Sequence, residues 1–177
     1  MINLKTLILN GSPRKNGNTA FIISKIKDRL NANVVNSFDI KFSHCVDCGH
    51  CKKRKCIFND ELTEIINDID NYDNIIIASP LNYNQTTGSI LSLASRFQII
   101  FNSKIKLKEK KGGIIVVGGG DTVVNSADAE KTMRIILRCL NINEFSYIRS
   151  LHTSSIPADK DETIDSQINE FIKKMNQ

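Results

Sequence analysis

The sequence predicts an α/β fold in which a five-stranded parallel sheet is covered by helices on both faces. Five short apolar runs alternate along the 177 residues with five segments whose apolar residues recur at helical spacing. This alternation is typical of parallel sheets, because each connection between parallel strands crosses a face of the sheet. The chain has no internal repeat and no long linker, so we expect a single domain over residues 1–177.

The predicted strands are apolar runs that end in turn residues. The first ends in a Gly-Ser turn, the third is closed by Pro80, and the fourth runs into three glycines. The strands are expected over residues 5–10, 33–40, 74–79, 111–120 and 144–151.

The predicted helices have apolar residues three or four positions apart and charges that suit their ends. Phe21, Ile22 and Ile26 recur in the first, which Asn18 or Thr19 can cap. The second begins with acidic residues, and the last has acids first and lysines last, as the helix macrodipole favours. The helices are expected over residues 18–30, 60–69, 88–100, 125–142 and 159–175.

Composition argues against several classes of partner. The net charge of +5 is mild, Trp is absent and no basic stripe is interleaved with aromatics, so we expect no nucleic-acid partner. No apolar run approaches the roughly 18 residues of a membrane helix, so we expect no membrane partner. The N-terminal apolar run is too short for a signal peptide and no small-residue cleavage site follows it. We therefore expect a cytoplasmic protein whose cysteines stay reduced.

The loop after the first strand, NGSPRKNGNTA at residues 10–20, is suited to a phosphate group. It leads into a helix N-terminus, whose backbone N–H groups bind anions, and it adds hydroxyl, amide and guanidinium donors. It lacks the Gly-Lys-Ser/Thr of a Walker A loop and the third glycine of G-x-G-x-x-G, which argues against ATP or Rossmann-type NAD binding. An ordinary turn is the alternative.

The segment GSPRKNGNT after an apolar strand resembles the phosphate loop of NAD(P)H-dependent FMN reductases in the flavodoxin-like superfamily. The resemblance covers about residues 4–140. It implies a flavodoxin-like three-layer sandwich with strand order 2-1-3-4-5, FMN as cofactor, NAD(P)H as co-substrate and a homodimer or homotetramer. It also implies that the FMN phosphate is held by Ser12, Arg14, Asn16, Gly17, Asn18 and Thr19.

Two more loops leave the carboxyl ends of predicted strands, where ligands of such sheets bind. The loop SPLNYNQTTG at residues 79–88 follows the family pattern, except that Asn82 stands where the family usually has Tyr and Tyr83 comes next. The resemblance implies that backbone donors of residues 81–84 meet the polar rim of the flavin and that Tyr83 covers its face; a surface turn is the alternative for Tyr83. The next helix ends in Ser-Arg where the family often has Asp-Arg, and we assign no role to Arg96.

The loop after the fourth strand contains three glycines, which let the backbone approach a flat ligand. In the family this loop also lines the flavin. The candidate cofactor-binding residues of these two loops are Pro80, Leu81, Asn82, Tyr83, Asn84, Gly118, Gly119 and Gly120.

Four of the five cysteines lie in one loop between the second strand and the second helix, which we call the cysteine loop (residues 44–58). Zinc sites usually pair two separated Cys-x2-Cys units, whereas tight overlapping spacing is closer to the ferredoxin arrangement around a [4Fe–4S] cluster. The spacing and position resemble those of iron–sulfur flavoproteins, a branch of the same superfamily. The resemblance implies a [4Fe–4S] cluster with the ligands Cys45, Cys48, Cys51 and Cys56.

Alternatives for the cysteine loop stay open: no metal, a zinc ion or a disulfide. Lys52 to Lys55 could offset the charge of a cluster, attract an acidic electron-transfer partner or bind the extra phosphate of NADPH. His44 and His50 flank the cysteines and are weaker ligand candidates. Cys48 and Arg54 match a phosphatase-like Cys-x5-Arg spacing, but their loop does not directly follow a buried strand.

The resemblance implies an oxidoreductase in which FMN takes a hydride from NAD(P)H and passes electrons to an acceptor. That acceptor would be a small molecule or a ferredoxin-like protein, reached through the cluster if one is present. No catalytic triad is evident, and we expect no protein catalytic residue because the cofactor carries the chemistry. The alternatives are a plain FMN reductase without a cluster and a non-enzymatic flavodoxin-like electron carrier. A pI near 9.0 argues against the carrier, since flavodoxins are typically acidic.

Overall fold

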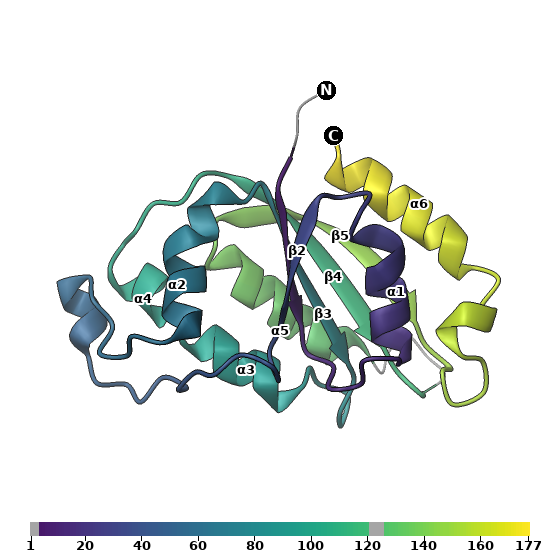
Figure 1. Ribbon diagram of the computed structural model, residues 1–177, viewed down its shortest axis with the longest axis horizontal. Coiled ribbons are helices and arrows are strands. Elements are labelled where there is room, and N and C mark those ends of the chain that lie inside the picture. Colours follow the sequence, from purple (N-terminus) through teal and green to yellow (C-terminus); the bar gives the residue numbers. More distant parts are fainter. Residues whose placement is uncertain (1–3, 121–125) are drawn as a thin grey trace.

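The computed structural model describes residues 4–120 and 126–177. Its centre is a parallel sheet of five strands in the order β2-β1-β3-β4-β5 (Figure 1), which confirms the predicted class and strand order. The strands are β1 (Thr6–Asn10), β2 (Ala32–Asn36), β3 (Asn74–Pro80), β4 (Lys110–Val117) and β5 (Ile142–Ser150).

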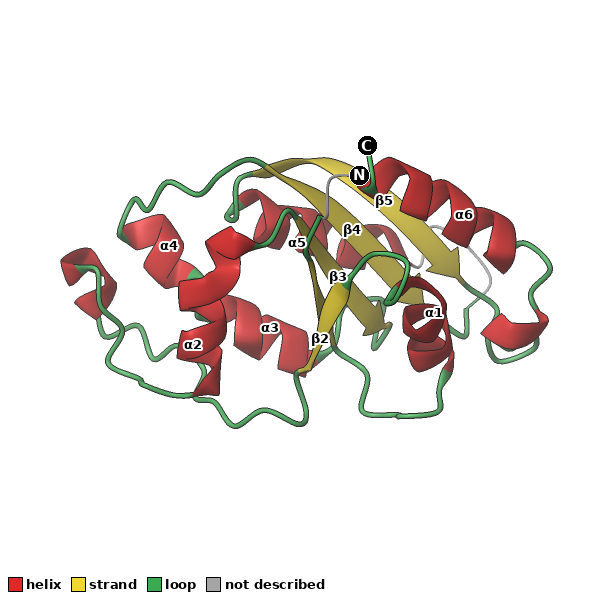
Figure 2. Cartoon of the chain, turned by 45° about the horizontal axis from the view of Figure 1, so that its top comes forward, coloured by secondary structure: helices red, strands yellow, loops and turns green. Residues whose placement is uncertain are grey.

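Helices cover both faces of the sheet. Helices α1 and α6 lie on one face, and α2, α3, α4 and α5 lie on the other (Figures 1 and 2). In the described ranges, no helix is long and apolar enough to cross a bilayer. The α-helices are α1 (Asn18–Ile26), α2 (Glu61–Asp68), α3 (Gly88–Ser95), α4 (Gln98–Asn102), α5 (Ala127–Arg138) and α6 (Ile164–Met175). The short 3₁₀ helices are η1 (His50–Lys53), η2 (Ile69–Asn71) and η4 (Ala158–Lys160).

The two apolar cores follow from the alternation of side chains along each strand. Leu7 and Leu9 of β1 belong to the core under α2, α3 and α5, whereas Ile8 belongs to the core under α1 and α6. Central strands of a parallel sheet are buried on both faces, which explains why the middle of β1 is apolar and why every one of its residues is buried.

The strand register brings all the carboxyl ends to one edge of the sheet. Asn10 pairs with Asn36 on one side and Ala78 on the other, and Pro80 pairs with Val117, which pairs in turn with Ser150. The loops that follow the strands therefore start side by side, at the lower edge in Figure 1.

Several predicted elements differ in their bounds. The predicted helix over residues 88–100 divides into α3 and α4, because the amides of Arg96 and Phe97 bond carbonyls only three residues back and end the first helix. The predicted helix over 159–175 starts late, because Asp161 is extended and accepts bonds from the amide and hydroxyl of Thr163. The second strand stops at Asn36, where the chain turns.

Candidate functional site

The loop after β1 is a compact turn fixed to the sheet. The amide of Gly11 donates to the carbonyl of Ala78 at 2.8 Å, and the amide of Ser12 donates to the side chain of Asn10 at 3.0 Å. The turn leads into α1, whose N-terminus has no side-chain cap and no acidic residue in its first turn. Its first amides are therefore available to an anion.

The loop after β3 joins the loop after β1 through Thr87. The Thr87 hydroxyl donates to the carbonyl of Gly11 at 3.0 Å, and its amide donates to the hydroxyl of Ser79 at 3.0 Å. Between β3 and α3 the chain makes a tight hairpin, in which the amides and carbonyls of Asn82 and Gln85 bond each other at 2.9 Å. The two tip residues have positive φ angles, and one of them, Tyr83, is fully exposed.

The first residue of the loop after β4, Gly118, packs between the loops that follow β3 and β5. The amide of Gly118 donates to the carbonyl of Ser150 at 2.9 Å, and its carbonyl accepts from both the amide and the hydroxyl of Thr153 at 3.0 Å. A Cβ on Gly118 would lie 2.8 Å from a methyl group of Leu81 in the loop after β3. The backbone thus approaches that loop more closely than another residue type would permit.

These loops surround a cavity of about 450 Å³ at the carboxyl edge of the sheet, which we call the edge cavity. Ten of the fourteen predicted cofactor-binding residues line it: Ser12, Arg14, Gly17, Asn18, Thr19, Pro80, Leu81, Asn82, Gly118 and Gly119. The structure places the other four outside this lining: Asn16, Tyr83, Asn84 and Gly120.

Six lining residues were not among the predicted ones: Pro13, Phe38, Thr87, Val117, Thr153 and Ser154. Phe38 was assigned to the second strand, but that strand has already ended and the ring is half exposed in the cavity wall. Thr153 and Ser154 follow β5, and the small hydroxylated run HTSS was a usable signal of the same kind as the loop after the first strand.

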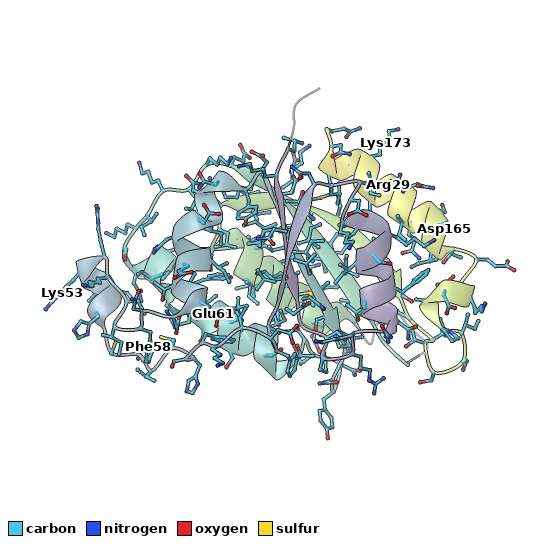
Figure 3. The ribbon with its side chains drawn as sticks, in the orientation of Figure 1. Arg29, Lys53, Phe58, Glu61, Asp165 and Lys173 are labelled. Carbon is cyan, nitrogen blue, oxygen red and sulfur yellow. The ribbon has the colours of Figure 1, made fainter. Side chains whose placement is uncertain are left out.

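The cysteine loop lies at the left edge of the molecule in Figure 1, beyond α2 and α4. Lys53 is at its outer tip, and Phe58 lies where the chain comes back toward α2 (Figure 3). All five cysteines are free thiols; Cys51 is buried and Cys48 is exposed. Burial raises the pKa of the Cys51 thiol, and the charges of Cys45, Cys56 and Cys48 raise it further. The four sulfurs of the loop therefore share one electrostatic neighbourhood. As described, however, no three Cys, His, Asp or Glu side chains gather closely enough to hold a metal ion.

Arg96, to which the sequence assigned no role, fastens the base of the cysteine loop. Its buried guanidinium donates to the carbonyl of Ser43 at 2.8 Å, to the carboxylate of Asp60 at 2.8 Å and to the hydroxyl of Thr63 at 2.7 Å. The ring of Phe58 lies 5.0 Å from its guanidinium carbon. No signal in a single sequence identifies which helix-end arginine turns inward.

The Asp60 carboxylate is the acidic half of this anchor and also caps α2. Burial alone would raise its pKa, but hydrogen bonds from Arg96 and from the amides of Ser43 and Thr63 outweigh burial and lower the pKa to about 2. Two further serines hold the cysteines themselves: Ser95 Oγ accepts from the amide of Cys45 at 3.0 Å, and Ser103 Oγ donates to the carbonyl of Cys51 at 2.6 Å.

Comparison with known proteins agrees with this architecture. A model of the NADPH-dependent FMN reductase family matches residues 4–153. An iron–sulfur flavoprotein of Methanosarcina thermophila is 26% identical over 97% of this chain and 93% of its own. The chain spans only 62%, 60% and 56% of the length of three other iron–sulfur flavoproteins, from Methanocaldococcus jannaschii and Archaeoglobus fulgidus.

Solved structures show the same fold at low identity. An FMN-dependent NADH-azoreductase of Bacillus anthracis, in complex with FMN, superposes with a TM-score of 0.68 at 12% identity and covers 98% of both chains. RosB, with a bound intermediate, gives a TM-score of 0.70 at 18% identity and covers 96% of this chain and 76% of its own. Because the family model spans most of the sequence, the chain belongs to the NADPH-dependent FMN reductase family.

Proposed function

We propose that the chain is an FMN-dependent oxidoreductase that takes reducing equivalents from NADH or NADPH. The observation that carries this proposal is the edge cavity, whose wall combines an uncapped helix N-terminus with loop backbone from three further strands. A helix N-terminus of this kind binds a phosphate group. The membership of the chain in the NADPH-dependent FMN reductase family supports FMN as the ligand. When bound, FMN accepts a hydride from the nicotinamide and passes electrons to an acceptor.

In this proposal the chain's own residues bind and orient the cofactor. Ser12, Arg14 and Thr19 line the cavity and offer the phosphate hydroxyl and guanidinium donors, in addition to the amides of the first turn of α1. The Asn18 side-chain oxygen accepts from the amide of Ala158 at 3.0 Å, so its amide nitrogen is the part left for the phosphate. Asn16 stays in the proposed set as part of the same loop.

Apolar contact with the flavin ring would come from two residues of the cavity wall. Leu81 and Phe38 line it, and Phe38 offers the aromatic surface that we expected from Tyr83. We keep Tyr83 and Asn84 as rim residues of the hairpin and Gly120 as part of the neighbouring loop; none of the three lines the cavity.

We further propose a [4Fe–4S] cluster on Cys45, Cys48, Cys51 and Cys56. The close spacing of four cysteines in one loop and the iron–sulfur flavoproteins among the relatives support it. Ligation requires the loop to draw the four sulfurs closer together than they now lie. The exposed cations Lys52, Lys53, Arg54 and Lys55 would face an acidic electron acceptor.

We propose a homodimer or homotetramer as well. Leu91, Phe101 and Ile135 are exposed and line one surface hollow between α3, α4 and α5, which supports association. Sedimentation analysis tests it.

The testing experiment is anaerobic purification followed by an absorption spectrum, assays of iron and sulfide, and NAD(P)H oxidation. Flavin bands, NAD(P)H oxidation and about four irons per chain support the full proposal. Cys48→Ser should lose the iron, whereas the matched Cys139→Ser, outside the cysteine loop, should keep it. Flavin and turnover without iron would leave a plain FMN reductase. Flavin without turnover would leave an electron carrier, and no flavin after FMN addition would refute the proposal.

A further inference from the structure

Arg96 is a buried cation with an unusual set of partners. Its side chain is 2% exposed, and its hydrogen bonds reach a backbone carbonyl, a carboxylate and a hydroxyl. Burying a charge is costly unless the charge is paired and hydrogen-bonded. Both terminal nitrogens of Arg96 have acceptors, whereas its buried Nε has no partner among the described residues. The planar fork of an arginine can hold three acceptors in fixed directions, whereas a lysine ammonium cannot reproduce that arrangement.

The partners of Arg96 lie on both sides of the cysteine loop in sequence. Ser43 comes two residues before Cys45, whereas Asp60 comes four residues after Cys56. One guanidinium therefore fixes the entry and the exit of the loop against each other. The ring of Phe58 also packs against the guanidinium, which adds a contact to the C-terminal part of the loop.

The C-terminal end of α3, where Arg96 lies, also contacts the first cysteine of the loop. Ser95, the neighbour of Arg96 and the last residue of α3, accepts the amide hydrogen of Cys45. At its other end, α3 follows Thr87, which lines the edge cavity and bonds Gly11. An eight-residue helix is about 12 Å long, so α3 is a short rigid connection between the edge cavity and the cysteine loop.

We propose that Arg96 is a positioning residue that holds the two ends of the cysteine loop together, so that the loop between them can bring its four thiolates onto one metal centre. The metal part of this inference rests on the proposed function. Arg96 does not line the edge cavity, and its hydrogen bonds reach oxygen atoms and no sulfur, so its effect passes through Ser43 and Asp60 to the loop. Groups that orient metal ligands in this way typically change metal affinity by about 10- to 100-fold when removed.

The test compares Arg96→Ala and Arg96→Lys with Lys110→Ala, a matched control. Lys110 is also buried and paired, with Asp70 at 2.7 Å, but lies at the amino end of β4, away from both sites. Anaerobic, reduced apoprotein is titrated with Co²⁺, whose thiolate charge-transfer band reports ligation by the loop. FMN content and melting temperature are measured on the same samples.

We expect Arg96→Ala and Arg96→Lys to weaken Co²⁺ binding by about tenfold or more, with FMN retained. Arg96→Lys keeps the charge beside Asp60 and should regain most of the melting temperature without regaining Co²⁺ affinity. That split separates positioning from simple stabilisation. Wild-type Co²⁺ affinity in both Arg96 variants, or an equal loss in Lys110→Ala, overturns the inference.

If the wild-type protein binds no metal, the proposed cluster is refuted but the positioning role of Arg96 is not. Alkylation of Cys51 tests that role without a metal. Cys51 is 8% exposed, so its alkylation by iodoacetamide requires the loop to open. We expect alkylation of Cys51, followed by peptide mapping, to be on the order of tenfold faster in Arg96→Lys than in the wild type. Equal rates overturn the positioning role.

Discussion

The edge cavity and the cysteine loop are held in place by different kinds of bond. The cavity loops after β1, β3 and β4 each begin with an amide that extends the sheet by one step: Gly11 bonds Ala78 of β3, Leu81 bonds Val117 of β4, and Gly118 bonds Ser150 of β5. The chain after β2 also starts with such a bond, from the amide of Ser37 to the carbonyl of Asn10, but the cysteine loop begins further along the chain. It is fastened by side chains instead: those of Ser95, Arg96, Ser103 and Asp60. The first region is therefore held mainly by backbone hydrogen bonds, with Gly11, Gly118 and Thr87 setting how closely its loops approach. The second region depends on a few particular side chains.

The largest expected effect comes from breaking the anchor of the cysteine loop. Asp60→Ala removes the carboxylate partner of buried Arg96 and the cap of α2, and should lower the free energy of unfolding by about 3–5 kcal/mol. Urea unfolding measures this loss. Glu170→Ala, which removes an exposed partner of Lys174, should leave stability unchanged. If the edge cavity and the cysteine loop are held independently, folded Asp60→Ala still binds FMN. A loss of FMN binding in parallel with the loss of stability would contradict this independence.

The second prediction disrupts the edge cavity and leaves the anchor of the cysteine loop intact, by a substitution at Gly11. A Cβ there would lie 2.4 Å from Ile90 and 2.6 Å from Thr87 Oγ1, so Gly11→Ala should separate the loop after β1 from α3. Overpacking of this kind costs about 1–3 kcal/mol, and FMN affinity should fall with it. Gly88→Ala, with nothing within 4 Å of the added Cβ, is the control. Fluorescence titration with FMN measures the affinity, and unchanged binding in Gly11→Ala would show that the cavity tolerates movement of this loop.

This difference also explains what a single sequence reveals. Alternating strands and helices specify the sheet, and the sheet specifies which loops meet at its carboxyl edge. Within those loops, the resemblance to FMN reductases implied the ten predicted residues that line the cavity. The cavity residue Phe38 was missed because its apolar character was assigned to a strand. The anchors of the cysteine loop were missed for a stronger reason: Arg96 lies 36 residues from Asp60, and no periodicity predicts such a contact.

The anchor should also be sensitive to acid. The pKa of Asp60 is lowered from 3.8 to about 2 in the folded protein, so its ionised form stabilises the fold above about pH 4. That contribution, about 2 kcal/mol, is lost as the pH falls from about 4 to about 2. The stability difference between wild type and Asp60→Asn, measured in urea at several pH values, should shrink over this window. The difference isolates Asp60 from other carboxylates, and a constant difference would contradict the anchor.

The smallest expected effect comes from removing the hydrogen bond that holds the backbone of Cys51. Ser103 is buried and its hydroxyl donates to the carbonyl of Cys51, so Ser103→Ala leaves that carbonyl without this partner. Loss of one such bond costs about 1 kcal/mol, which urea unfolding can resolve. Ser24→Ala, which removes an exposed hydroxyl bonded to Phe21, should cost less. Because Ser103 lies between α4 and the loop, its variant should speed alkylation of Cys51 while FMN affinity is unchanged. A fall in FMN affinity instead would mean that the two regions are coupled through the helices that separate them.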